Sequence, residues 1–428
     1  MIIITTPPER FCGELTPPGD KSITHRAIMF GALARGITEV RGYLDAEDCR
    51  STISCLRSLG VKIVARGEKL LVEGRNMNLD PPEKPLDAGN SGTTARLLMG
   101  ILAGQHFSAT VTGDSSLKKR PMKRVTEPLQ AMGAEFSGEG GGEYLPLTIR
   151  GGNLKAIEFI SPRPSAQVKT AILLAGLYAE GDSIVEEPYL SRNHTELMLA
   201  RFGAKVESEG SRVTLHGKPA LHGVPVMVPG DLSAAAFFLV AAAIIPGSDL
   251  LLKHVGVNPT RSGIIDVLTR MGASIELRNK QTWGAEPVVD ILIRGGTRLK
   301  GVAVGGEDIP RLIDELPILA VAAAVAKGKT VISGASELRV KESDRISALT
   351  EELKKMGAGI EETEDGMIIE GRTALKGTEV ESCGDHRIAM ALAVAGLAAE
   401  NETVVNDAGV IEISFPGFMQ SLRSLISR

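Results

Sequence analysis

Leu268-Thr269-Arg270-Met271-Gly272-Ala273 is one of five similar phrases that recur at intervals of roughly 70 to 85 residues along the chain. Each phrase predicts the end of a helix, closed by a glycine in the left-handed conformation and followed by a short strand such as Ser274-Ile275-Glu276. The phrase therefore marks a structural unit that the chain repeats. The other four copies begin at Leu56, Leu129, Leu199 and Leu353.

Further elements accompany this phrase. An Ala-rich helix and a Gly-marked strand lie upstream, as at Ala34 to Val40, Ala179 to Val185 and Ala326 to Val331. A sixth copy begins at Asp385, and Phe418 to Ile426 would be its closing helix. Each unit then contains about two helices and three or four strands, which predicts an α/β (α+β) fold.

Two Pro-Gly segments, Thr16-Pro17-Pro18-Gly19 and Val228-Pro229-Gly230, have three repeats between them. We therefore predict one three-repeat domain over residues 20–228. The second three-repeat domain is discontinuous and consists of residues 1–19 and 229–428, with the N-terminal strand pairing back onto it. The two linkers that join the domains would act as a hinge.

The composition excludes several classes of protein. A hydrophobic content of 43% with only 4% aromatic residues describes a globular protein whose helices pack through small side chains. A net charge of −4 argues against a nucleic-acid-coating protein, so an anionic ligand has to be met by local clusters of Lys and Arg. The four cysteines lack metal-ligand spacing, and the apolar stretch Ala234 to Ile245 is too short to span a bilayer. We expect a cytoplasmic protein without a metal.

The segment Gly19-Asp20-Lys21-Ser22-Ile23-Thr24-His25-Arg26-Ala27 predicts a helix start with Asp20 as its N-cap. Lys21 opposes the positive end of the helix dipole, and Arg26 adds a second cation one turn later. An anion with several oxygens, docked at this helix start, would explain both cations. The alternative is a solvated polar helix start.

Similar caps recur along the chain. If each domain packs three such helices in parallel, their N-termini converge on one face, and six positive dipole ends surround the cleft between the domains. Such a cleft suits a polyanion. The expected helix starts are Gly19-Asp20, Asn90-Ser91-Gly92, Pro164-Ser165-Ala166, Gly230-Asp231, Asp308-Ile309-Pro310 and Gly384-Asp385.

Three charged positions have both a local and a functional interpretation. Arg120 lies in a basic segment that, taken alone, is typical of a solvated loop. The segment Glu337 to Arg345 is typical of a surface salt-bridge network at a helix start. Asp314 interrupts the apolar stretch Ile309 to Val325, where an unpaired buried carboxylate would be costly.

Taken together, nine motifs in order make the chain resemble the 5-enolpyruvylshikimate-3-phosphate (EPSP) synthase family, over nearly its whole length. The family fold is two domains of three βαβαββ units each, with the active site in the cleft between them, which agrees with the repeat count. Three of the motifs, SAQ-x-K, R-x-H-x-E and N-x-T-R, look like the second class of the family, which is often described as more tolerant of glyphosate. The nine are GDKSITHRA at 19–27, NSGT at 90–93, KRPM at 119–122, SAQVK at 165–169, SRNHTE at 191–196, NPTR at 258–261, IDELP at 313–317, KESDR at 341–345 and DHRIAMA at 385–391.

The resemblance implies transfer of the enolpyruvyl group of phosphoenolpyruvate to the 5-hydroxyl of shikimate 3-phosphate with release of phosphate. This reaction belongs to the shikimate pathway, which leads to chorismate and the aromatic amino acids. Two phosphorylated carboxylates must lie side by side, and their repulsion demands many cations. The resemblance implies no cofactor and no nucleic-acid or membrane partner, and we expect a monomer.

The site residues are carried over motif by motif. Phosphoenolpyruvate would be held by Lys21, Gly92, Arg120, Gln167, Arg345 and Arg387. Shikimate 3-phosphate would be held by Lys21, Ser22, Arg26, Ser165, Ala166, Gln167, Arg192, Asp314 and Lys341. Glu342 is the candidate acid at the methylene carbon, Asp314 the candidate base at the 5-hydroxyl, and Lys21 an assistant in proton transfer.

Two other families compete with this interpretation. The enolpyruvyl transferase acting on UDP-N-acetylglucosamine usually carries a Cys, sometimes an Asp, on a mobile loop. The matching region from Gly113 to Arg124 has no Cys but does contain Asp114. An RNA-end-binding protein built from related repeats would have a broad basic surface studded with aromatic residues, which this composition does not provide. The chain departs from its family at Ile413, where many members carry a Lys.

An alanine at position 92 is associated with glyphosate tolerance in the family. We predict that Gly92→Ala raises the inhibition constant of glyphosate more than the Michaelis constant for phosphoenolpyruvate, because glycine leaves room for the inhibitor. Steady-state kinetics at varied inhibitor concentration measure both constants, and equal rises in the two would contradict this account.

Overall fold

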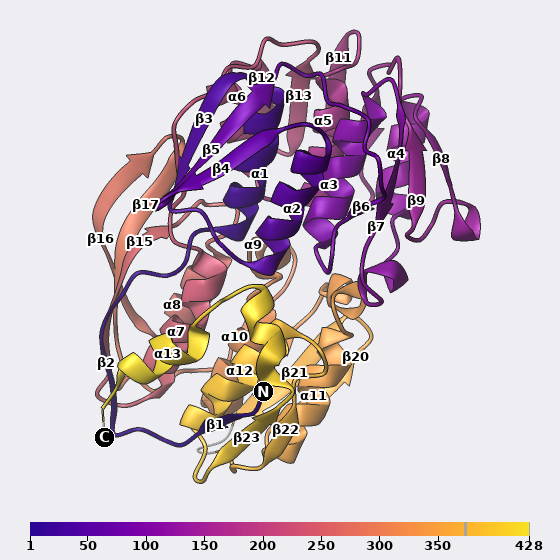
Figure 1. Cartoon of the computed structure of the whole chain (residues 1–428). Coiled ribbons are helices and arrows are strands. Elements are labelled where there is room, and N and C mark those ends of the chain that lie inside the picture. Colours follow the sequence, from indigo (N-terminus) through magenta and orange to yellow (C-terminus); the bar gives the residue numbers. More distant parts are fainter. Residues whose placement is uncertain (372–374, 428) are drawn as a thin grey trace. The chain divides into compact units, whose positions relative to one another are not determined.

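The structure is a computed structural model that describes residues 1–371 and 375–427 of the 428-residue chain (Figure 1). The chain forms two compact units. The first unit comprises residues 19–228 and 283–286, and the second comprises residues 1–18, 229–282 and 287–428. Two of the four chain crossings lie in the Pro-Gly segments, which are poor in regular structure because proline and glycine disfavour helix and strand interiors. The other two flank residues 283–286.

Three four-stranded sheets make up the first unit. In two sheets the order is first, second, fourth, third along the chain, and in the other β14, from the end of the unit, takes the first place. In all three, the strands in the first two places are parallel and the other pairs are antiparallel. The sheets are β14(Val226–Met227), β3(Arg35–Arg41), β5(Lys69–Arg75), β4(Lys62–Arg66); β6(Leu86–Asp87), β7(Ser108–Thr112), β9(Leu147–Arg150), β8(Glu135–Gly138); and β10(Glu158–Ile160), β11(Asp182–Glu186), β13(Arg212–His216), β12(Val206–Glu209).

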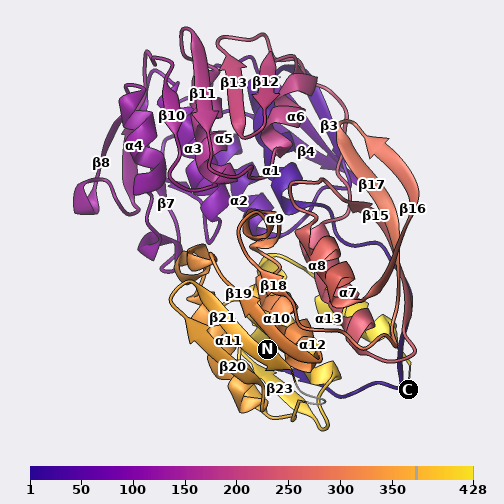
Figure 2. The ribbon, with the colours of Figure 1, turned by 180° about the vertical axis from the view of Figure 1, so that it is seen from behind.

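The strands of the second unit form three more sheets, two of which use the N-terminal segment (Figure 2). β1(Ile3–Thr5) lies at the edge of its sheet and pairs antiparallel with β23. β2(Arg10–Leu15) pairs parallel with β15. The sheets are β16(Ser274–Trp283), β17(Glu286–Arg294), β15(Asp249–Gly256), β2, β24(Ile426–Ser427); β18(Ala303–Val304), β19(Gly328–Ile332), β21(Gly366–Gly371), β20(Gly359–Thr363); and β1, β23(Thr403–Asn406), β22(Glu379–Glu381).

The predicted six-fold repeat is confirmed by these sheets. Five of them contain the same order of four strands, and the sixth is completed by β1 from the other end of the chain. Because β1 pairs with β23, the N-terminal segment and the C-terminal repeat belong to the same sheet of the second unit.

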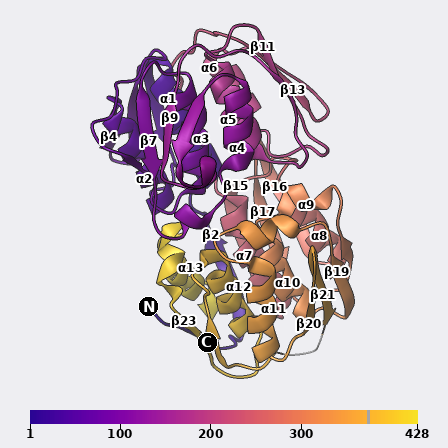
Figure 3. The same ribbon diagram turned by 90° about the vertical axis from the view of Figure 1, so that its right-hand side faces the viewer.

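Six central helices, three in each unit, are almost wholly buried because they are apolar around their whole circumference. Small side chains let them pack closely, and Figure 3 shows α7, α12 and α10 side by side. The first unit contains α1(Lys21–Leu33), α3(Gly92–Ala103) and α5(Ala166–Gly176). The second contains α7(Leu232–Ile244), α10(Leu316–Val325) and α12(His386–Leu397).

The remaining helices are shorter or have one exposed face, so they cover the central ones. They are α2(Glu47–Ser58), α4(Lys123–Ala131), α6(His194–Phe202), α8(Gly263–Met271), α9(Asp308–Leu312), α11(Arg345–Lys355) and α13(Phe418–Ser424), with 3₁₀ turns at η1(Leu117–Lys119), η2(Glu139–Gly141), η3(Ser336–Val340) and η4(Ala408–Ile413). Within the part of the chain that the structure describes, no helix combines the length and the hydrophobicity needed to cross a membrane.

One predicted helix start is wrong. Asp308-Ile309-Pro310 does not open the long apolar helix but the short α9, and α10 begins afresh at Leu316. The reason is Pro317 in the first turn of α10, because a continuous helix would need its missing N–H and would clash with its ring. Asp314 therefore lies between two helices and not inside one.

The glycine that ends each repeated phrase has a positive φ in all five copies, as predicted. The values are +82° at Gly60, +111° at Gly133, +104° at Gly203, +96° at Gly272 and +82° at Gly357. L-residues with a side chain rarely adopt this conformation, so glycine here fixes the point where helix turns into strand.

We predict that Gly133→Ala lowers the free energy of unfolding by about 1–2 kcal/mol, the usual cost of a left-handed L-residue. Space is not the cause, because a Cβ at this position would meet only the Asn153 carbonyl oxygen, at 3.5 Å. Gly152→Ala is the matched control in the same unit, since a Cβ there meets nothing within 4 Å and its φ is ordinary. Urea unfolding followed by circular dichroism measures both variants, and equal midpoints would refute the assignment.

Candidate active site

The three central helices of the first unit begin at polar N-caps. The Asp20 carboxylate accepts a hydrogen bond from the Ile23 N–H at 2.9 Å, the Ser91 hydroxyl from Thr94 at 3.1 Å and the Ser165 hydroxyl from Val168 at 3.4 Å. Each bond satisfies one of the amides that a first helical turn leaves open. Each helix start therefore keeps a positive end that favours an anion.

The side chain of Gln167 joins two of these helix starts. Its Oε1 accepts hydrogen bonds from Arg96 at 3.0 Å and from Arg124 at 3.4 Å, and its Nε2 donates to the Thr93 hydroxyl at 3.2 Å. The starts of α3 and α5 are therefore adjacent, and two guanidinium groups meet between them.

A third guanidinium, that of Arg120, lies beside Gly92. Arg120 is 6% exposed and donates to Asn90 Oδ1 at 2.7 Å and to Ser116 Oγ at 3.1 Å. A Cβ built on Gly92 would lie 2.7 Å from an Arg96 nitrogen and 3.5 Å from an Arg120 nitrogen. The backbone at Gly92 is thus flanked by two arginines, which is the arrangement that a phosphate needs.

The cations of α1 are held in different ways. Lys21 Nζ lies 2.9 Å from Asp48 Oδ2, and its side chain is 19% exposed. Arg26 is 3% exposed and donates to the Thr195 hydroxyl at 2.7 Å, to the Thr170 hydroxyl at 2.8 Å and to the Ser22 carbonyl. Burial lowers the pKa of Arg26 to about 10, so it remains a cation at neutral pH. Arg26 therefore holds α1 against α5 and α6 while adding positive charge below the helix start.

The motif that begins at Ser165 also contains a buried ion-pair triad. Lys169 Nζ lies 2.9 Å from Glu187 and 2.8 Å from Glu196, and all three side chains are buried. Glu187 also accepts from the Ser165 N–H at 2.6 Å and from the Ser191 hydroxyl at 2.6 Å. Burial alone would lower the pKa of Lys169, but the Glu196 and Glu187 carboxylates outweigh burial and raise this pKa. The triad fixes the segment that carries Ser165, Ala166 and Gln167.

The loop before α6 carries Arg192, which is half-buried. Its charge is one of the causes that lower the pKa of Arg26, after burial, so the two arginines lie near each other. The next helix begins at His194, whose Nδ1 lies 2.7 Å from the Glu286 carboxylate.

In the second unit, Asp314 lies among three cations. Its Oδ1 is 3.8 Å from Lys341 Nζ and 3.7 Å from Arg345, and its Oδ2 is 3.9 Å from Arg387. Arg387 also donates to the Asp314 backbone carbonyl at 2.9 Å. Burial lowers the pKa of Lys341, and the carboxylate of Asp314 opposes that shift. The carboxylate therefore lies within ion-pair distance of all three cations.

Arg345 is the most heavily paired of these cations and is 1% exposed. It donates to Asp385 at 2.7 Å and to Glu342 at 2.6 Å. Burial alone would lower the pKa of Arg345, but Asp385, Glu342 and Asp314 outweigh it and raise the pKa. Burial alone would raise the pKa of Asp385, but the charge of Arg345 outweighs burial, and the pKa is lowered. Glu342 therefore lies against a permanently charged guanidinium.

The family model for EPSP synthase (3-phosphoshikimate 1-carboxyvinyltransferase) matches residues 5–422. The chain belongs to the EPSP synthase family. It is 54% identical over 428 residues, the whole of both chains, to the 3-phosphoshikimate 1-carboxyvinyltransferase of Desulforamulus reducens. It is 55% identical over 413 residues to that of Thermoanaerobacter sp., covering 96% of this chain and 97% of the relative.

A solved EPSP synthase from Acinetobacter baumannii has a TM-score of 0.88 and 44% identity, covering 99% of this chain and 98% of that chain. These findings confirm the predicted fold and the predicted enzyme, a shikimate-pathway transferase that moves the enolpyruvyl group of phosphoenolpyruvate to shikimate 3-phosphate. They favour it over the transferase acting on UDP-N-acetylglucosamine. Assignment to the second class of the family stays a prediction.

The EPSP synthase residues predicted from the motifs fall into three groups in the structure. Lys21, Ser22, Arg26 and Arg192 gather at the start of α1. Gly92, Arg120 and Gln167 gather at the starts of α3 and α5, with Ser165 as the N-cap of α5 and Ala166 as its first residue. Asp314, Lys341, Glu342, Arg345 and Arg387 gather in the second unit.

Four charged residues of these groups were missed by the sequence analysis: Arg96, Arg124, Asp48 and Asp385 as a partner of Arg345. Arg96 had a usable signal, because it lies four residues after Gly92 and hence on the same helix face. Asp385 was predicted only as a helix cap, and it is one, since it accepts from the Arg387 N–H at 2.8 Å.

We predict that Lys169→Met lowers the free energy of unfolding by about 3–5 kcal/mol, because it leaves two buried carboxylates without their cation. Lys205→Met is the matched control, since Lys205 also pairs with a glutamate at 2.9 Å but is 68% exposed. The control should leave stability almost unchanged. Chemical denaturation of both variants is the measurement, and equal losses would show that burial is not the cause.

Proposed function

We propose that this enzyme binds both substrates through the three groups above and performs an addition followed by an elimination. The observation that carries the proposal is the arrangement of Arg96, Arg120 and Arg124 around Gly92 and Gln167. Three guanidinium groups beside two helix starts favour an anion, because a phosphate oxygen would accept from guanidinium and backbone N–H alike.

Phosphoenolpyruvate would use this arginine group for its phosphate, with Gly92 giving close backbone access. Lys21, Arg120 and Gln167 supply donors in the first unit. Arg345 and Arg387 supply positive charge in the second unit, where Asp314 and Glu342 neutralise part of it. The substrate carboxylate would complete that charge balance.

Shikimate 3-phosphate would lie against the starts of α1 and α5. Ser22, Ser165, Ala166 and Gln167 offer hydroxyl, amide and backbone donors, while Arg192 and Lys21 offer charge at the surface of the unit. Arg26 would act from below, because its N–H groups already bond Thr195, Thr170 and the Ser22 carbonyl. Asp314 and Lys341 would contact the ring hydroxyls.

The proton steps follow from the chemistry. In the addition, Asp314 accepts the proton of the 5-hydroxyl, the hydroxyl oxygen bonds to C2 of phosphoenolpyruvate, and Glu342 gives a proton to its methylene carbon. In the elimination, Glu342 takes a proton back from that carbon, the bond from C2 to the phosphate oxygen breaks, and phosphate leaves with assistance from Lys21. Arg345, at 2.6 Å from Glu342, stabilises the carboxylate form that the elimination needs.

The direct test is phosphate release on mixing the enzyme with shikimate 3-phosphate and phosphoenolpyruvate. Release with UDP-N-acetylglucosamine instead would overturn the proposal. We also propose that the enzyme is a cytoplasmic monomer that needs no cofactor, and light scattering during gel filtration measures the oligomeric state.

We predict that Glu342→Gln lowers turnover by roughly a hundredfold or more, the usual scale for a lost acid or base, while the Michaelis constants change little. Glu351→Gln is the matched control, because Glu351 is an exposed residue of the neighbouring α11. Steady-state phosphate release measures both variants. Near-normal turnover of Glu342→Gln would remove this residue from the mechanism.

A further inference from the structure

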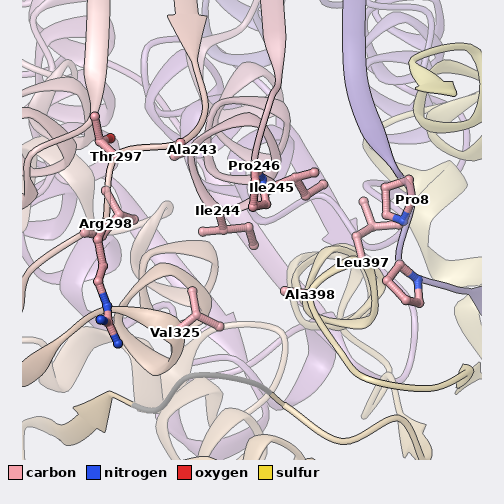
Figure 4. Close-up of a pocket in the computed structure, with 13 residues that line it drawn as sticks. Pro8, Ala243, Ile244, Ile245, Pro246, Thr297, Arg298, Val325, Leu397 and Ala398 are labelled. Atoms are coloured by element: carbon pink, nitrogen blue, oxygen red, sulfur yellow. The ribbon is translucent and has the colours of Figure 1, made fainter.

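The second unit contains a cavity of about 510 Å³ at the C-terminal ends of its three central helices (Figure 4). The residues assigned to the reaction lie at the opposite, N-terminal ends of α10 and α12, so the cavity is separate from them. Its lining is Pro7, Pro8, Ala243, Ile244, Ile245, Pro246, Gly296, Thr297, Arg298, Leu299, Val325, Leu397 and Ala398.

The repeat shows which positions of the first unit correspond to this lining. Ala175-Gly176-Leu177-Tyr178-Ala179-Glu180 and Ala395-Gly396-Leu397-Ala398-Ala399-Glu400 differ at one position only, Tyr178 against Ala398. Both segments end the corresponding central helix, α5 or α12, and lead into the next strand of its repeat. Tyr178 and Ala398 are therefore equivalent positions.

Glycines at the end of the last strand of a repeat, Gly74 within β5 and Gly295 directly after β17, support the same register. A Cβ on Gly74 would meet the Ala34 and Gly31 carbonyls at 2.1 and 2.5 Å, at the end of α1. A Cβ on Gly295 would meet the Ile245 and Ala242 carbonyls at 2.1 and 2.6 Å, at the end of α7. Each of these glycines faces two carbonyl groups three residues apart at the end of a central helix. The backbone at the C-terminal ends of the central helices is therefore arranged alike in the two units.

In the first unit the Tyr178 ring occupies this place. The ring packs so closely on Gly104 that a Cβ there would lie 2.2 Å from it. Its hydroxyl accepts a hydrogen bond from Gln105 Nε2 at 2.8 Å, and the Gln105 side chain also bonds the Met77 carbonyl and the Leu79 N–H. Burial raises the pKa of Tyr178, so it stays a neutral phenol. The ring and the amide together fill the end of the helix bundle.

In the second unit, Ala398 stands at the position of Tyr178, and the cavity lies beside Ala398. Ile244, Val325 and Ala398 come from the three helix ends and provide apolar walls, as Figure 4 shows. The helix C-termini carry negative partial charge, so an anionic group would avoid the depth of the cavity. Arg298 and Thr297, both exposed, are the lining residues that offer a cation and a hydroxyl.

We propose that this cavity is a binding site for a small aromatic carboxylate. The ring would lie beside Ala398, in the place that the Tyr178 ring takes in the first unit, and the carboxylate would pair with Arg298. A preformed cavity with apolar side-chain walls accepts a planar ring because the surrounding backbone needs no rearrangement.

The test uses 4-hydroxyphenylacetate as the probe and the full-length enzyme, with binding followed by calorimetry and ligand-observed NMR. We expect saturable binding to the wild type and at least a tenfold loss of affinity in Ala398→Tyr, which fills the cavity from within. Arg298→Ala should weaken the carboxylate probe several-fold and leave phenol binding unchanged. Ala398 lies outside the groups assigned to catalysis, so phosphate release checks that Ala398→Tyr is folded, and Val325→Phe replaces it if it is not.

The converse variant is Tyr178→Ala, which opens the corresponding place in the first unit and should add a second site for the probe. Three results would overturn the proposal. The first is no saturable binding by the wild type up to roughly 10 mM probe. The second is unchanged affinity in the filled variants, and the third is equal affinity for cyclohexylacetate, which has the carboxylate but no aromatic ring.

Discussion

In each unit the N-termini of the three buried helices lie close together. The backbone N–H groups of their first turns have no partner within the helix, and the side chains of the site have to provide for them. An uncapped buried helix start costs free energy, since its N–H groups have lost water and found no partner. The caps Asp20, Ser91 and Ser165 satisfy one amide each in the first unit, and Asp231 and Asp385 do so in the second. The remaining positive potential is what makes both places suitable for anions.

The two units differ in the charged side chains that surround these helix starts. In the first, Arg96, Arg120 and Arg124 add positive charge around Gly92 and Gln167, which favours an anionic ligand there. In the second, Asp314, Glu342 and Asp385 supply the negative charge themselves. Since a buried ion pair gains little net stability, the pairing of Arg345 with Asp385 is better explained by the orientation it imposes on Glu342.

The sequence predicted those features that depend on neighbouring residues. The C-terminal glycines, the N-terminal strand at Ile3 and five of the six expected helix starts follow from local chemistry, and so does the repeat. The break before Leu316 was missed because Pro317 is as compatible with a first helical turn as with the end of the preceding helix. Contacts between distant residues left no such signal. Arg96 and Gln167 are 71 residues apart, and Arg345 and Asp385 are 40 apart, so only the fold brings them together.

Comparison of the repeats separates what the fold requires from what the reaction requires. Gly19-Asp20-Lys21-Ser22 and Gly230-Asp231-Leu232-Ser233 open equivalent helices with the same capping aspartate. At the third position α7 has a fully buried leucine, whereas α1 has a lysine against the helix dipole. Because the helix start forms with leucine, its stability does not demand Lys21, and the nearby Asp48 only reduces the cost of that charge. The charge of Lys21 is the one that the proposed binding of both substrates would use.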